Sequence, residues 1–326
     1  MSSAEIPAKK YRIKYFSNFC TTQKCKAVAE TIYETDKMPN YGPDKDIYVT
    51  VGEDFTHAIV LNGNFNPAAL SRVPKENRIG LAYEPPLFLN ITPQFAIDVR
   101  KNLGKYYIGD AAEILGPNFV NSFAYMWHMP PLRAPPVKQS NVLISIMVSE
   151  KRTAEGHKYR HQLVQAILMY ALPIDIYGRG SSMYGGGSGG NLRARKLGMV
   201  LDEAQETTAS RHVKGTFKET EPYLGYHFHI AIENFRTPHY FSEKIINPLL
   251  CGTTPIYWGC ENIDEYFPNT VIKLSGTIES DIALILQILQ NPEKFRTYVD
   301  VDAVKRRTNL LQNLDTVFGG DETNTI

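Results

Sequence analysis

The sequence predicts an α/β protein built on mostly parallel sheets. Short apolar, β-rich stretches alternate along the chain with stretches of helical periodicity. One apolar stretch, residues 227–232, ends in Glu233-Asn234, and a helix capped by Ser242 and a second apolar stretch at 255–258 follow it. Strand–helix–strand units of this kind bring parallel strands together, with their carboxyl ends along one edge. Ligands of open α/β sheets bind along that edge.

The first half of the chain contains alternating expected strands and helices. The strands lie at residues 11–16, 47–51, 58–61, 79–83 and 106–108, and the helices at 27–33 and 95–102. The fourth strand ends in Glu84-Pro85-Pro86, where two prolines stiffen a carboxylate at the expected sheet edge. A carboxylate held there suits a general base, which must reach the hydroxyl that it deprotonates. The alternative is a surface turn with a solvated acid.

A proline-rich segment at residues 129–139 separates the two halves. Proline favours extended backbone, so we expect the domain linker here. A chain of 326 residues exceeds one typical core. We therefore expect a first domain over residues 1–135, a second over 136–300, and a C-terminal helix followed by a disordered tail over 301–326.

The second half repeats the strand–helix pattern. We expect strands at 141–148, 174–177, 227–232, 255–258 and 271–274, and helices at 157–170, from Ser242 to Gly252, at 279–289 and within 293–314. In the helix that Ser242 caps, Lys244 would lie beside unpaired N–H groups, a position that suits a phosphate or diphosphate. Glu243 could accept hydrogen bonds from ribose hydroxyls. The alternative is ordinary helix chemistry, with an acid in the first turn and a solvated lysine.

The string IENFRTPHYFSEKI, followed by TTPIYWG, resembles the donor-binding motif of the α-1,3/4-fucosyltransferases, the family-ten glycosyltransferases. That motif is roughly F-E-N, several residues, Y-x-[ST]-E-K-[IL], then P-[IV]-x-x-G. The matching residues are Glu233, Asn234, Tyr240, Ser242, Glu243, Lys244, Pro255 and Gly259. The sequence departs from the motif at Ile232 and Phe235, which flank Glu233-Asn234, and at His239, where an acid or glycine is usual.

The resemblance implies a GT-B-like fold, with two facing Rossmann-like domains and a cleft between them. The first domain would bind the acceptor and the second the nucleotide sugar, and the final helix would cross back to the first domain. The implied activity is an inverting transfer of L-fucose from GDP-fucose to a hydroxyl of a glycan. Two alternatives remain: a transferase of the same fold that uses another nucleotide sugar, and a non-catalytic glycan-binding relative.

The resemblance also assigns roles to individual residues. Glu84 matches the proposed base of related enzymes, which follows a strand in a Glu-x-Pro sequence. By position, Arg160 resembles an arginine that contacts the donor diphosphate, since a guanidinium can grip two phosphate oxygens. A solvated basic helix face is the alternative for Arg160. The donor-binding set implied by the resemblance is Arg160, Glu233, Asn234, Tyr240, Glu243 and Lys244.

Composition excludes several other classes of protein. The net charge of +1 gives no electrostatic case for nucleic acid or an anionic membrane. No apolar run approaches the roughly 20 residues of a membrane span, and the N-terminus lacks the apolar region of a secretory signal. We therefore expect a cytoplasmic protein, like bacterial or viral relatives of the family. The cysteines and histidines match no metal template, so we expect no required metal or cofactor.

Overall fold

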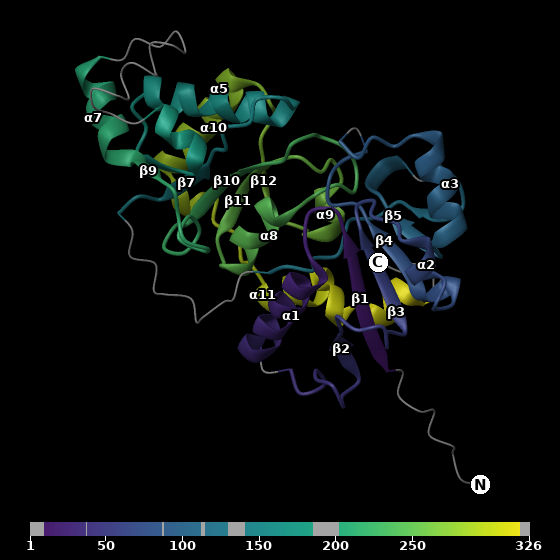
Figure 1. Ribbon diagram of the computed structural model, residues 1–326. Coiled ribbons are helices and arrows are strands. Elements are labelled where there is room, and N and C mark those ends of the chain that lie inside the picture. Colours follow the sequence, from purple (N-terminus) through teal and green to yellow (C-terminus); the bar gives the residue numbers. More distant parts are fainter. Residues whose placement is uncertain are drawn as a thin grey trace. The chain divides into compact units, whose positions relative to one another are not determined.

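The computed structural model describes residues 10–36, 38–86, 88–111, 115–129, 141–184 and 202–319 (Figure 1). Apart from Met129, the expected linker at 129–139 lies outside these ranges, as does the expected tail beyond Gly319. The chain divides into two compact units, Met1–Pro131 with Arg306–Ile326, and Leu132–Lys305. Each unit contains one six-stranded sheet with helices, which confirms the predicted α/β class.

The first unit is a parallel sheet in the order β2-β1-β3-β4-β5-β6. Its strands are β1 (Tyr11–Ser17), β2 (Ile47–Val49), β3 (His57–Leu61), β4 (Arg78–Leu81), β5 (Lys105–Tyr107) and β6 (Phe119–Val120). Its helices include α1 (Thr22–Asp36), α2 (Pro67–Leu70) and α3 (Pro93–Asn102). Every strand pair is parallel, and the chain reverses its direction of progress between β1 and β3. That reversal is the topological switch point of the first sheet.

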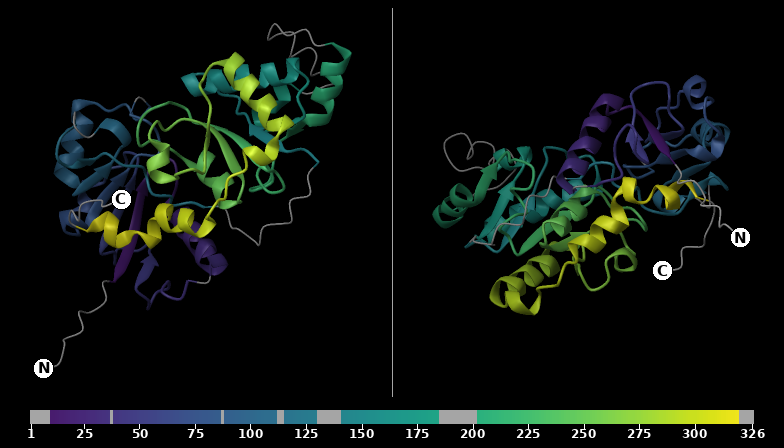
Figure 2. Two further views of the ribbon diagram at one scale, coloured as in Figure 1. Left: turned by 180° about the vertical axis from the view of Figure 1, so that it is seen from behind. Right: turned by 90° about the horizontal axis from the view of Figure 1, so that it is seen from below.

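The C-terminal segment completes the first unit. Helix α11 (Val301–Thr308) leads into it, and α12 (Leu314–Phe318) follows. The Tyr107 hydroxyl donates to the carbonyl of Val317 at 3.1 Å, and the Tyr11 hydroxyl donates to Asp315. The ring of Phe318 lies 4.7 Å from that of His57. The yellow C-terminal helices are visible in both views of Figure 2.

The second unit is also parallel throughout, in the order β12-β11-β10-β7-β8-β9. Its strands are β7 (Ile144–Met147), β8 (Ile174–Tyr177), β9 (Val213–Gly215), β10 (Phe228–Ile232), β11 (Thr254–Trp258) and β12 (Ile272–Lys273). Its helices include α5 (Glu155–Met169), α7 (Glu203–His212), α8 (Glu243–Leu250), α9 (Ile263–Tyr266) and α10 (Ile278–Gln290). The switch point of this sheet lies between β7 and β10.

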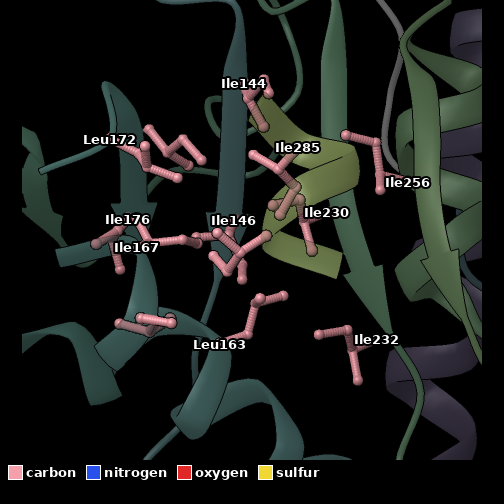
Figure 3. Close-up of a cluster of buried hydrophobic side chains, with 14 of the residues drawn as sticks. Ile144, Ile146, Leu163, Ile167, Leu172, Ile176, Ile230, Ile232, Ile256 and Ile285 are labelled. Carbon is pink, nitrogen blue, oxygen red and sulfur yellow. The ribbon is translucent and has the colours of Figure 1, made fainter. Parts of the chain in front are cut away.

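Branched apolar side chains fill the core of the second unit. Ile146, Ile176 and Ile230 come from the central strands, and Leu163 of α5 and Ile285 of α10 pack against them (Figure 3). All of these side chains are fully buried or nearly so. Because the central strands are buried on both faces, most of their residues are apolar. The polar residues inside them, Ser145, Asp175 and His229, are themselves buried.

Candidate functional site

The candidate site lies at the carboxyl edge of the second sheet, beside the β7–β10 switch point. Strand β10 is buried over its whole length, and Glu233 and Asn234 follow it directly. Helix α5 begins shortly after β7, and its residue Arg160 is buried beside the end of β10. Helix α8 begins after the loop that follows Asn234. Two segments far apart in the sequence, α5 with Arg160 and the stretch from Glu233 to Lys244, therefore contribute polar side chains to one edge.

Glu233 holds the first turn of α8 in place. Its side chain is fully buried, with an exposed fraction of 0%. The backbone N–H of Ser242 donates to Glu233 Oε1 at 2.8 Å, and the Ser242 hydroxyl donates to Oε2 at 2.7 Å. The Lys244 ammonium lies 3.4 Å from Oε2 and donates to Ser242 Oγ at 3.0 Å. Both carboxylate oxygens of Glu233 are thus occupied within the protein.

Lys244 lies between two carboxylates. Besides the contact with Glu233, its Nζ is 3.2 Å from Glu243 Oε1. The side chain of Glu243 is 56% exposed, whereas that of Lys244 is 23% exposed. Burial disfavours the charged lysine, but Glu243 and Glu233 outweigh it and raise the pKa of Lys244. The ammonium is therefore permanently charged at neutral pH, with one side toward the buried acid and one toward solvent.

Burial also governs the other charged groups of the site. It raises the pKa of the Glu233 carboxyl, against the opposing effect of Lys244. It lowers the pKa of Arg160, against the attraction of Glu233 and Glu243. The Arg160 guanidinium donates to the carbonyl of Ile232, the last residue of β10. A guanidinium carries five N–H donors, so this bond fixes the arginine and leaves donors for other acceptors.

Gly156 brings the beginning of α5 against the end of β10. Its N–H donates to the carbonyl of Asn234 at 2.9 Å. The next residue, His157, accepts from the N–H of Ala154 at 3.2 Å through Nδ1. The sequence analysis identified neither Gly156 nor His157. The available signal was the short segment between a buried strand and a long helix, which places Glu155-Gly156-His157 at the beginning of that helix.

Replacing Gly156 by alanine is expected to lower the free energy of unfolding by about 3 kcal/mol. A Cβ at this position would lie 1.8 Å from the carbonyl oxygen of Glu233 and 3.0 Å from that of Asn234. Both neighbours are backbone atoms, so α5 or β10 must shift. Gly63→Ala is the control, because its Cβ would meet only the ring of Phe95, at 3.1 Å. Urea unfolding measures both variants, and equal stability of the two would contradict the close packing.

Hydrogen bonds join the loop between β10 and α8 to the beginning and end of α9. The N–H of His239 donates to Asn262 Oδ1 at 2.8 Å, and His239 Nδ1 lies 2.5 Å from the Tyr266 hydroxyl. His239 has a φ of 60°, in the left-handed region that favours glycine. Glycine adopts this conformation without strain, so His239 is held in it by its hydrogen bonds. Tyr240, the next residue, is buried.

Three buried histidines are expected to make the second unit less stable in acid. Burial is the main cause that lowers the pKa of His157 and His161 to about 4, and that of His229 to about 3, from the ordinary 6.5. As the pH falls below 6.5, the unfolded chain takes up protons before the folded chain does. The free energy of unfolding should therefore decrease between pH 6.5 and about 4, by on the order of 1–2 kcal/mol per histidine at pH 5.

Urea unfolding at pH 7 and pH 5 tests this dependence. The variant His161→Gln removes one of the three groups, so its stability should change less with pH than that of the wild type. An equal change in the two proteins would show that His161 is not the source of the acid sensitivity.

The structure brings together the expected donor-binding residues, all of which belong to the second unit. Arg160, Glu243 and Lys244 lie with Glu233, Asn234 and Tyr240 at the edge of the second sheet. Glu84 belongs to the first unit, where it follows β4. It is partly exposed, and Pro85 after it is buried.

Two parallel α/β sheets, each with a switch point, make up the GT-B fold. The Anabaena protein HepE, solved in complex with UDP, shares this fold with a TM-score of 0.56. The match covers 94% of this chain and 98% of that chain, at 9% sequence identity. Residues 137–306, more than half of the chain, match the C-terminal model of glycosyltransferase family 10 (fucosyltransferase). The chain belongs to this family.

Two relatives are similar over shorter segments. A fucosyltransferase-like protein of Acanthamoeba polyphaga mimivirus is 31% identical over 119 residues, which are 32% of this chain and 20% of the relative. Alpha-(1,3)-fucosyltransferase B of Drosophila melanogaster is 35% identical over 75 residues, which are 23% of this chain and 15% of the relative. The matched segments thus span a fifth or less of each relative's length.

The part of the chain that the structure describes contains neither a helix that could span a membrane nor a cluster of potential metal ligands. Among the helices of that part, none combines the length and the apolar character needed to cross a membrane. Over the same part of the chain, no three side chains of His, Cys, Asp or Glu are grouped as metal ligands would be.

Proposed function

We propose that the protein transfers L-fucose from GDP-fucose to a hydroxyl of a glycan acceptor, with inversion at the anomeric carbon. The observation that carries this proposal is the Glu233–Ser242–Lys244 cluster, with Arg160 beside it, at the switch point of the second sheet. Membership of family 10 supports fucose as the sugar. A fixed pair of cations at a sheet edge is the arrangement that a diphosphate requires.

The donor-binding residues divide into those that contact the ligand and one that holds them. Lys244 and Arg160 would bind the diphosphate, and the exposed carboxylate of Glu243 would accept from the ribose hydroxyls. Asn234 and Tyr240 would line the diphosphate or the fucose. Glu233 has no exposed surface and its oxygens bind Ser242, so we assign it to positioning Lys244 rather than to direct contact.

In the proposed reaction, Glu84 accepts the proton of the acceptor hydroxyl. The acceptor oxygen forms a bond to C1 of fucose from the face opposite the nucleotide, and the bond from C1 to the diphosphate oxygen breaks. GDP leaves with the electron pair and gains negative charge in the transition state. Because Arg160 and Lys244 are held in place before the reaction, they stabilise this charge with little reorganisation.

We expect turnover to continue in the presence of EDTA, because Arg160 and Lys244 supply the positive charge that a divalent ion supplies elsewhere. The measurement is GDP release from GDP-fucose with and without the chelator. Complete loss of activity in EDTA, restored by Mg²⁺ or Mn²⁺, would contradict a metal-independent mechanism.

A panel of sugar nucleotides tests the proposed donor. GDP-fucose, GDP-mannose, UDP-xylose and UDP-glucose are each offered together with an array of glycan acceptors, and released nucleotide is measured. Turnover with GDP-fucose alone supports the proposal. Preference for another donor would assign the chain to a different transfer reaction. Glycan binding without binding of any sugar nucleotide would make the protein a non-catalytic relative.

A further inference from the structure

The first sheet has a switch point of its own, between β1 and β3. Strands β1 and β3 lie side by side, and their carboxyl ends are Ser17 and Leu61. The loops that follow are joined, because the Asn64 side chain donates from Nδ2 to the carbonyl of Ser17 at 2.9 Å. In the second sheet the corresponding position holds the cationic cluster. By the same rule of α/β topology, the side chains at the carboxyl ends of β1 and β3 form a candidate ligand site.

Three aromatic rings gather at this edge, and we call Phe19, Tyr83 and Trp127 the aromatic platform. The ring of Phe19 lies 6.4 Å from that of Tyr83, at 72°, and 6.4 Å from that of Trp127, at 54°. Phe19 is 51% exposed, although burial of a phenylalanine side chain is favourable by about 2 kcal/mol. Tyr83 and Trp127 are partly exposed beside it, and aromatic side chains that gather in one place with polar groups around them are typical of ligand sites.

Hydrogen bonds fix Tyr83 of the aromatic platform, and polar side chains lie next to the platform residues in the sequence. The N–H of Tyr83 donates to Asn62 Oδ1 at 2.9 Å, and its hydroxyl donates to the carbonyl of Tyr125. Glu84 follows Tyr83 directly, and Asn18, which precedes Phe19, is exposed. A fixed apolar surface with hydrogen-bonding groups at its edge is complementary to a pyranose ring, which has a C–H face and a rim of hydroxyls.

We propose that the aromatic platform binds one pyranose ring of the acceptor, stacked on Phe19 with its hydroxyl rim toward Glu84. This inference rests on the proposed function, since it places the acceptor sugar beside the proposed base. Beyond the proposed function, it names the part of the acceptor that binds here, a pyranose ring, and the three aromatic residues that would select it. An acyclic polyol offers the same hydroxyls without a flat face, so the platform should discriminate against it.

Fluorescence of Trp127 gives a direct test that does not depend on turnover. The chain has two tryptophans, so Trp258→Phe leaves Trp127 as the reporter. Methyl β-galactoside, lactose and the acyclic polyol glucitol are titrated into the full chain. We expect a saturable change in emission with the first two and none with glucitol. Phe19→Ala should weaken the apparent affinity about tenfold or more. Phe19→Tyr, which keeps the ring, should retain the wild-type response.

Tyr298→Ala is the matched control, because Tyr298 is an exposed aromatic residue of the second unit, 85% exposed. An unchanged titration in Phe19→Ala, or no saturable response to either pyranoside in the parent protein, would overturn the inference. Calorimetry with GDP on the same samples separates the two proposals. GDP binding without a pyranoside response rejects only the platform. A pyranoside response with no binding of GDP or GDP-fucose rejects the proposed transferase but leaves a glycan-binding platform.

Discussion

Replacing Glu84 by glutamine is expected to lower the turnover number for fucose transfer by about 10²–10⁴, the usual contribution of a general base. Glutamine keeps the shape of the side chain but cannot accept the proton of the acceptor hydroxyl. Because the proposed donor-binding residues belong to the other unit, the affinity for GDP should not change. The measurements are steady-state transfer from GDP-fucose and calorimetry with GDP.

The control for this prediction is Glu76→Gln, an exposed glutamate of the same unit. It should transfer fucose at the wild-type rate. If Glu84→Gln also transfers at that rate, the base is another residue. If it loses both transfer and stability, the Glu84 carboxylate holds the turn at the end of β4 rather than taking part in the reaction.

Replacing Lys244 by alanine is expected to abolish donor turnover and GDP binding. The substitution removes a charge that would bind the diphosphate, and it leaves the fully buried Glu233 without its cationic neighbour. The second effect should lower the free energy of unfolding by about 1–3 kcal/mol, since Ser242 still satisfies both oxygens. Wild-type activity in this variant would show that Lys244 does not bind the donor diphosphate.

A double variant separates ligand binding from stability. Combining Lys244→Ala with Glu233→Gln replaces the buried acid by a neutral group, so stability should recover while GDP binding remains lost. Lys273→Ala is the matched control, because Lys273 is an exposed lysine of the same unit, paired with Asp264. Recovery of GDP binding in the double variant would show that Lys244 acts only by neutralising Glu233.

The sequence predicted the donor side of the candidate site well because its signals are local. The expected strand at 227–232 is β10 (Phe228–Ile232), and the expected cap Ser242 begins α8. A buried strand, a side-chain cap and a short helix each leave a recognisable pattern within a few residues. Once those elements were placed, Glu233 and Lys244 had to lie near one another at the edge.

The sequence did not reveal features that depend on contacts between distant segments. Gly156 is required by the carbonyl of Glu233, which is far from it in the chain. The short edge strands β6 and β9 were not predicted either. Helix α7 was also missed, since its polar sequence lacks a clear apolar face.

The platform illustrates the same limit. Phe19, Tyr83 and Trp127 come from three separate segments, and none of them was a candidate from the sequence. Only the order of strands β1, β3 and β4 in the sheet brings the first two together. The isolated bridge between Met126 and Asn309 then fixes the backbone next to Trp127.

The return of residues 306–319 to the first sheet has a consequence for synthesis of the chain. The Tyr11 hydroxyl donates to Asp315, so strand β1 is made about 300 residues before its hydrogen-bond partner. The second unit is continuous along the chain and can complete its core earlier. We therefore expect the second unit to fold first during synthesis, and the first unit to close only after residues 306–319 have been made, although its strands precede those of the second unit.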